Sequence, residues 1–182
     1  MERLLITGFE AFGGRPANTS WRLAVALAAF AGQGAHALPA RRLEVDHVPA
    51  ARALRRFCLE RPSALMMLGE WSGSSFRIER YARPGPLAPW AGGVRPARWP
   101  VVPLFRAMRC AALPVRLSED AGRYVCDTSY WAALSTSVPR VVFVHVPRYW
   151  PAARDRSAVQ ALHQGLVHAR NRGPWVSVPA GE

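Results

Sequence analysis

The chain has 182 residues, half of them apolar, which is enough to bury the core of one domain and excludes a disordered chain. Its formal net charge is +12, and all 24 basic residues are arginines that are scattered along the sequence. This charge attracts anions at long range, but no helix-turn-helix, zinc-finger or RNP-like motif accompanies it, so we do not expect nucleic-acid binding.

Short apolar runs alternate with helix-start signals, which predicts strands and helices in turn. In chain order we predict a strand at 4–7, a helix between 18 and 34, a strand within 37–45, a helix from 49 to 58, a strand at 64–69, a helix at 102–112, a strand at 114–118, a helix at 128–134, a strand at 139–144 and a helix at 157–169. This alternation indicates parallel βαβ units with right-handed crossovers. We therefore predict a single domain over 1–182 of the α/β class, a three-layer α/β/α sandwich with a mostly parallel central sheet.

Two stretches predict no regular structure. Residues 70–79 have the composition of a polar loop. Residues 84–100 hold five prolines and three glycines, and we expect them to pass over the edge of the sheet because both flanks belong to the same sheet.

The three cysteines, Cys58, Cys110 and Cys126, form no CxxC pair, which argues against a disulfide framework or a zinc site. The first strand begins within a few residues of Met1 and leaves no room for a signal peptide, and no apolar run is long enough to span a bilayer. We therefore expect a cytoplasmic protein with no metal, no cofactor and no membrane contact.

The stretch 121–127 predicts a tight turn followed by a helix start that holds Cys126. A thiol in this position lies among unpaired backbone N–H groups, and the helix dipole favours its thiolate. The pattern is thus typical of a nucleophilic cysteine. A small buried cysteine beside a helix start is the alternative, and for a cysteine taken at random it is the more common case.

Glu79, Cys126 and His145 follow predicted strands at comparable places. Because the carboxyl ends of parallel strands meet at one edge of a sheet, we expect the three side chains to converge there. An imidazole can accept the thiol proton and later protonate a leaving amine, while a carboxylate orients the imidazole. From spacing alone, His145 as a satisfied core residue and Glu79 as a surface ion-pair partner remain open.

Four segments of the chain carry recognisable motifs: 6–14 with 18–21, 68–80, 118–127 and 143–147. In that order they resemble TGF-x-PFGG followed by N-P-S-W, a glycine-rich segment ending in E-R, S-x-x-AG-x-[FY]-[VL]-C-[ND], and F-[IV]-H-[VI]-P. These are motifs of the pyroglutamyl peptidase I family, the pyrrolidone-carboxylate peptidases, which are cysteine peptidases. The first and third motifs are specific, and the four together span most of the chain.

The resemblance implies that Cys126 is the nucleophile, His145 the base and acid, and Glu79 the orienting carboxylate. A small neutral lactam such as a pyroglutamyl ring needs an apolar pocket with a few polar contacts. The residues that the resemblance places around that ring are Phe9, Phe12, Tyr124 and Val125.

The sequence departs from the family pattern around the expected cleft. Glu70 stands where the family usually has Gln or Leu, so we expect a carboxylate among the substrate-binding residues, beside the lactam. The arginine of the glycine-rich segment is missing, with Ser74 or Ser75 in its region, and the loop at 83–101 is shortened.

The leading prediction is a cysteine exopeptidase, or omega-peptidase, which removes N-terminal pyroglutamyl residues from peptides through a thioester and needs no cofactor. Such a peptide is the expected partner, and the sequence leaves a homo-oligomer open. One alternative is a weakened or inactive relative that acts as a binding or regulatory protein, as the altered cleft residues favour. Another is a thiol hydrolase with a changed substrate, in which Glu70 receives a free amino group.

Overall fold

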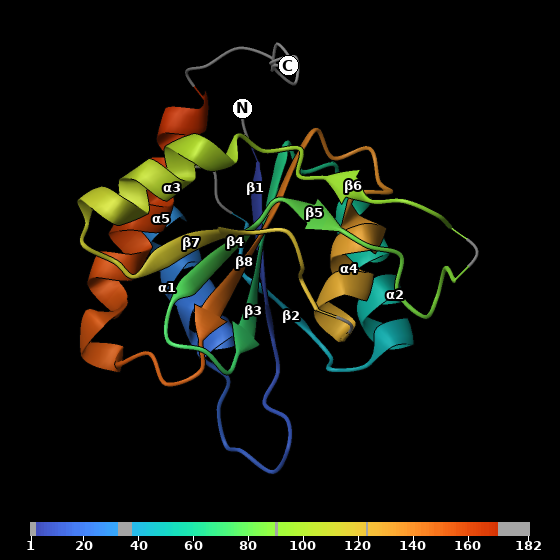
Figure 1. Cartoon of the computed structure of the whole chain (residues 1–182), viewed down its shortest axis with the longest axis horizontal. Coiled ribbons are helices and arrows are strands. Elements are labelled where there is room, and N and C mark those ends of the chain that lie inside the picture. Colours follow the sequence, from blue (N-terminus) through green and yellow to red (C-terminus); the bar gives the residue numbers. More distant parts are fainter. Residues whose placement is uncertain (1–2, 33–37, 90, 123, 171–182) are drawn as a thin grey trace.

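The computed structural model of the chain describes residues 3–32, 38–89, 91–122 and 124–170. Within these residues a six-stranded sheet, in the order β2-β1-β3-β8-β4-β7, has helices on both faces (Figure 1). In chain order the elements are β1 (Leu4–Phe9), α1 (Thr19–Gly32), β2 (Arg41–Leu43), α2 (His47–Cys58), β3 (Ala64–Trp71), β4 (Phe76–Glu79), β5 (Tyr81–Ala82), β6 (Arg95–Pro96), α3 (Val101–Cys110), β7 (Val115–Ser118), α4 (Val125–Ala133), β8 (Arg140–Pro147), a 3-10 turn (Ala152–Arg154) and α5 (Asp155–Arg170). The predicted α/β sandwich with a mostly parallel sheet is confirmed.

The sheet contains two strand directions. Strands β2, β1, β3 and β8 pair in parallel, whereas β4 pairs antiparallel to β8 and parallel to β7. The prediction of a polar loop over 70–79 is wrong, because β3 continues to Trp71 and the end of the stretch forms β4. Phe76 and Ile78 alternate there with two charged residues, which is the two-residue period of a strand with two unlike faces.

The edges of the sheet are its two outer strands. The second strand, β2, begins after Pro39 and lies at one edge, where a proline is tolerated nearby. The strand predicted at 114–118 is the opposite edge, β7, where Arg116 and Leu117 are exposed. Its short apolar pattern could not reveal that it pairs on one side with β4 in the described part of the chain.

Each face of the sheet has its own apolar core. Helices α1, α3 and α5 cover one face, here called the α5 face, and α2 and α4 cover the other, called the α4 face (Figure 1). The strand residues packed on the α5 face are Ile6, Ala64, Met66, Leu68, Phe76, Ile78, Val115, Val142, Val144 and Val146. Those packed on the α4 face are Leu5, Phe9, Leu43, Leu65, Met67, Val141 and Phe143.

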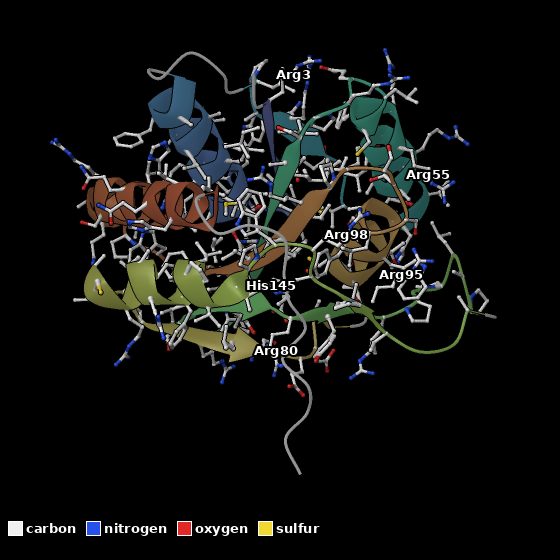
Figure 2. All side chains as sticks on the ribbon, turned by 90° about the horizontal axis from the view of Figure 1, so that it is seen from above. Arg3, Arg55, Arg80, Arg95, Arg98 and His145 are labelled. Carbon is white, nitrogen blue, oxygen red and sulfur yellow. The ribbon has the colours of Figure 1, made fainter. Side chains whose placement is uncertain are left out.

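The proline-rich excursion between β4 and α3 packs on α4 instead of passing over the sheet edge. Its ends pair as the short antiparallel ladder of β5 and β6. Arg95 stacks on the Trp131 ring at 3.9 Å, and Arg98 donates to the carbonyl oxygens of Ala133, the last residue of α4, and of Thr136 just beyond the helix. Figure 2 shows both arginines beside this helix. The excursion therefore holds the helix that carries Cys126.

Candidate active site

Two of the predicted residues, Glu79 and His145, meet on the α4 face of the sheet. Oε1 of Glu79 lies 2.8 Å from Nδ1 of His145. Both residues are buried, with 0 % and 5 % of their surface exposed, and Figure 2 places His145 in the interior of the molecule. An ionised carboxylate can only accept, so Nδ1 donates and Nε2 is left to accept a proton from another group.

The route by which these residues converge differs from the expected one. We predicted that they would meet at the carboxyl edge of a parallel sheet, but β4 runs antiparallel to β8. The end of β4 is therefore level with Phe143, in the middle of β8, with Glu79 opposite it. Because strand side chains alternate between faces, Phe143 and His145 lie on the same face as Glu79.

Cys126 is the second residue of α4, and its thiol lies over β3, the strand beside the one that carries His145. Gly69 on β3 pairs in register with His145 on β8. A Cβ added to Gly69 would lie 3.1 Å from Sγ of Cys126 and would overlap the Phe143 ring. Only glycine leaves room for the thiol at this point. Within the described residues the thiol has no hydrogen bond to His145, and such bonds often tighten only when substrate is bound.

The start of α4 is fixed by the turn before it and by contacts along it. Gly122 has φ +87°, a left-handed conformation suited to glycine, and its N–H donates to Oδ1 of Asp120 at 2.9 Å. Further along, the hydroxyl of Tyr130 donates to the Glu79 carbonyl oxygen at 3.2 Å. Nδ1 of His47 and the hydroxyl of Thr128 are 2.8 Å apart, which joins α2 to α4.

Burial raises the pKa of the Cys126 thiol to about 12, and the carboxylates of Glu79 and Asp127 add to this effect. The expectation that the helix start favours the thiolate is thus outweighed by desolvation and by two negative neighbours. In the free protein the thiol is protonated at neutral pH. A base must remove its proton before it can act as a nucleophile.

Asp127 is a buried residue that the sequence interpretation did not single out, although it stands in the nucleophile motif. Its Oδ1 accepts from the Arg83 backbone N–H at 2.8 Å, which attaches the excursion to the start of α4. Burial raises the pKa of this carboxyl to about 6. Its proximity in sequence to Cys126 was the signal that could have identified it.

Of the four residues expected around the pyroglutamyl ring, two are buried near Cys126 and two are more exposed. Phe9 and Val125 are buried in the same apolar cluster as Cys126, and the ring centroid of Phe9 lies 6.5 Å from that of Phe143. Phe12 is half-buried with the Arg15 guanidinium 4.4 Å above its ring. Tyr124 is 60 % exposed.

The carboxylate of Glu70, which we expected beside the lactam, does not lie on the same face of the sheet as Cys126. Strand alternation on β3 puts Glu70 on the α5 face, opposite to Gly69 and Cys126. Its carboxylate accepts from the Arg15 guanidinium, from Nε of Arg148 at 3.2 Å and from the Thr19 backbone N–H at 2.9 Å. Glu70 thus anchors the start of α1.

The described residues contain no group of three or more His, Cys, Asp or Glu side chains placed to hold a metal ion. Among the same residues, no helix combines the length and the apolar composition needed to cross a bilayer.

The comparisons with known proteins point to one family. No family model matches the chain. The pyrrolidone-carboxylate peptidase of Gloeobacter violaceus is 32 % identical over 168 residues, covering 80 % of this chain and 81 % of that protein. That of Thermococcus kodakarensis is 28 % identical over 90 % of this chain and 92 % of its own. The solved pyrrolidone carboxyl peptidase of Thermococcus litoralis has the same fold, with a TM-score of 0.76, 21 % identity, and 98 % and 100 % of the two chains covered. The chain belongs to the pyrrolidone-carboxylate peptidase family.

Proposed function

We propose that the protein is a cysteine peptidase that removes the N-terminal pyroglutamyl residue, a pyrrolidone carboxylate, from peptides. The relatives' shared name supports the substrate class. The observation that carries the proposal is the buried Glu79–His145 bond of 2.8 Å beside the strand position covered by the Cys126 thiol. A carboxylate, an imidazole and a thiol in this order make a nucleophile with its own base.

In the first step the thiol attacks the pyroglutamyl carbonyl carbon. Nε2 of His145 takes the thiol proton as the sulfur–carbon bond forms, and Glu79 stabilises the resulting imidazolium. The backbone N–H groups at the start of α4 hold the oxyanion. This role is supported by the absence of a side-chain cap from Tyr124, the residue at the N-cap.

In the second step the carbon–nitrogen bond breaks, and His145 returns its proton to the leaving amine. This leaves a thioester between the pyroglutamyl group and Cys126. His145 then takes a proton from water, the water oxygen attacks the thioester, and the thiolate leaves and is reprotonated. The products are free pyroglutamate and the shortened peptide, and no cofactor takes part.

We propose that the pyroglutamyl ring binds in an apolar pocket beside Cys126. Phe9 and Val125 are best placed for its apolar wall, because they already pack in the cluster that contains Cys126. We propose Phe12 and Tyr124 as its outer wall, which requires both to approach the ring when substrate binds. The polar contacts to the lactam come from backbone groups in this arrangement, since Glu70 lies on the other face.

We further propose that the chain forms a single domain that acts in the cytoplasm. The support for this location is chemical: Cys58, Cys110 and Cys126 are all free thiols. Free cysteines are typical of a reducing compartment.

The test is the release of aminomethylcoumarin from pyroglutamyl-aminomethylcoumarin. We expect turnover by the wild type, loss of at least about a thousandfold in kcat/KM for Cys126→Ala, and unchanged turnover for Cys110→Ala, a matched control at an exposed thiol on α3. A well-folded wild type without turnover would leave the binding or regulatory alternative as the better account. The altered-substrate alternative has lost its basis, because Glu70 is already paired with two arginines.

A further inference from the structure

One row of residues runs across the sheet on the α4 face, perpendicular to the strands. Arg116 on β7 pairs with Arg77 on β4, Arg77 pairs with His145 on β8, and His145 pairs with Gly69 on β3. We call these four residues the cross-sheet row. On β1, Thr7 is opposite Met67, so Phe9 comes level with Gly69 and extends the row.

The row has an apolar end and a cationic end. The Cys126 thiol lies over Gly69, with buried Phe9 on one side of it and His145 on the other. Beyond His145 stand Arg77 and Arg116. If the scissile carbonyl is at the thiol and its ring is on the Phe9 side, the leaving peptide extends past His145 toward the arginines, since His145 must reach the leaving nitrogen.

The two arginines are held in place by an indole. The Arg77 guanidinium carbon lies 3.5 Å from the centroid of the Trp71 ring, and that of Arg116 lies 5.2 Å from it. The Trp71 ring is itself fixed, because its N–H donates to the Ser75 carbonyl oxygen at 2.7 Å. Stacking of this kind orients a guanidinium and leaves its edge N–H groups available for an anion.

In the described part of the chain, neither Arg77 nor Arg116 forms an ion pair with a carboxylate. Nε of Arg77 is buried and has no hydrogen-bond partner among the same residues. The carboxylates that act on Arg77 are Glu79, which is bonded to His145, and Asp120, which accepts from Gly122.

We propose that Arg77, assisted by Arg116, binds a carboxylate on the leaving-group side of the scissile bond. This inference rests on the proposed peptidase function. The carboxylate has two sources in a peptide: the side chain of an Asp or Glu that follows the pyroglutamyl residue, or the C-terminus of a pyroglutamyl dipeptide. The protein therefore prefers acidic or very short substrates to neutral, C-terminally blocked ones.

The experiment compares three substrates that differ in one carboxylate. They are pyroglutamyl-asparagine amide, pyroglutamyl-aspartate amide and pyroglutamyl-asparagine with a free C-terminus. For the wild type at low salt we expect kcat/KM to be about fivefold higher for at least one of the two carboxylates than for the neutral amide, mainly through KM. The source that gives the larger gain is the one that Arg77 binds, and the gain shrinks as salt screens the charges.

Variants at the row and away from it complete the test. Arg77→Gln should reduce the preference to about onefold, and Arg77→Glu, whose carboxylate repels that of the substrate, should reverse it in favour of the neutral amide. Arg106→Gln, which removes the same charge from an exposed position on α3, should leave it unchanged. Thermal unfolding of each variant shows that it is folded before its kinetics are compared.

The outcomes separate this inference from the function beneath it. If the wild type cleaves all three substrates with equal kcat/KM, the carboxylate site is refuted while the peptidase function stands. The site is likewise refuted if folded Arg77→Gln keeps the full preference. If none of the three is cleaved, the proposed function fails and the inference fails with it.

Discussion

Glu70 and Glu79 come from one short stretch of sequence, yet they lie on opposite faces of the sheet in opposite chemical situations. The Glu70 side chain is 1 % exposed and is surrounded by two guanidiniums and a backbone N–H. The Glu79 side chain is 0 % exposed and has one described partner, His145, while its Oε2 is buried with no hydrogen bond in the described part of the chain.

The difference between their partners indicates which of the two buried carboxylates can take part in a reaction. Burial of a carboxylate is costly unless it is paired, and Glu70 is paired with cations that never lose their charge. The partner of Glu79 is an imidazole, which can gain and release a proton at its other ring nitrogen. Glu70 therefore serves as a permanent structural anchor, and Glu79 as a group whose interaction strengthens when His145 gains a proton.

The largest expected effect is that of Glu79→Gln on activity. The amide keeps the size of the side chain but cannot stabilise an imidazolium, so we expect kcat/KM toward a pyroglutamyl amide to fall by about a thousandfold. The free energy of unfolding should change much less than the activation energy. Full activity in this variant would show that Glu79, like Glu70, has only a structural role.

The next effect is that of Glu70→Gln on stability. Removal of the charge leaves Arg15 and Arg148 without their anion, and we expect urea unfolding to show a loss of about 3 kcal/mol. Activity of the folded fraction should remain close to that of the wild type. Glu60→Gln is the matched control, because Glu60 pairs with Arg3 and Arg41 at the surface and should cost less than about 1 kcal/mol.

Asp127 is a second buried carboxyl on the α4 face, and its effect on stability depends on pH. Its pKa is raised from 3.8 to about 6, so between these values the folded chain binds more protons than the unfolded chain. Stability contributed by this group is therefore greatest at acid pH and falls as pH rises from about 4 to 6, by roughly 2 kcal/mol. Asp127→Asn retains an acceptor for the Arg83 N–H and should flatten this part of the stability–pH curve. A curve with the same slope as the wild type would contradict the assignment.

The smallest predicted effect concerns the far end of the helix that carries the thiol. Arg98 donates to the carbonyl oxygen of Ala133 at the end of α4, at 3.2 Å, and to that of Thr136 just beyond it, at 3.0 Å, where a cation also complements the helix dipole. We expect Arg98→Gln to lower stability by about 1 kcal/mol in urea unfolding. Arg106→Gln again serves as the control, and an equal loss in both variants would indicate a general effect of net charge.

The fold was largely predictable, because long apolar runs and helix-start residues mark most of its elements. Strand β4 was missed because four residues with alternating polarity carry little signal beside the serines and glycine that precede them. Strand direction cannot be read from such a pattern either. The antiparallel pairing of β4 with β8, which brings Glu79 to His145, thus had to come from the structure.

The sequence singled out three residues that lie near one another in the structure, but it did not reveal their surroundings. The motifs identified Cys126, His145 and Glu79, whereas the placement of Glu70 depended on how far β3 continues and on which face its last residues lie. The raised thiol pKa was also hidden from the sequence, because it depends on burial and on the carboxylate of Glu79, which the fold brings close, as well as on that of the neighbouring Asp127. The cross-sheet row depends on register, which is a property of the assembled sheet alone.

The role of Cys126 as the nucleophile is tested most directly by the stoichiometry of inactivation by pyroglutamyl chloromethyl ketone. Mass spectrometry of the cysteine peptides then shows which thiol was modified. Because the Cys126 thiol is buried and protonated at rest, iodoacetamide should modify the exposed Cys110 first without loss of activity. The substrate-like reagent should instead modify Cys126, with activity lost in proportion to the fraction modified. Inactivation with Cys126 unmodified, or full modification of Cys126 with activity retained, would contradict the account.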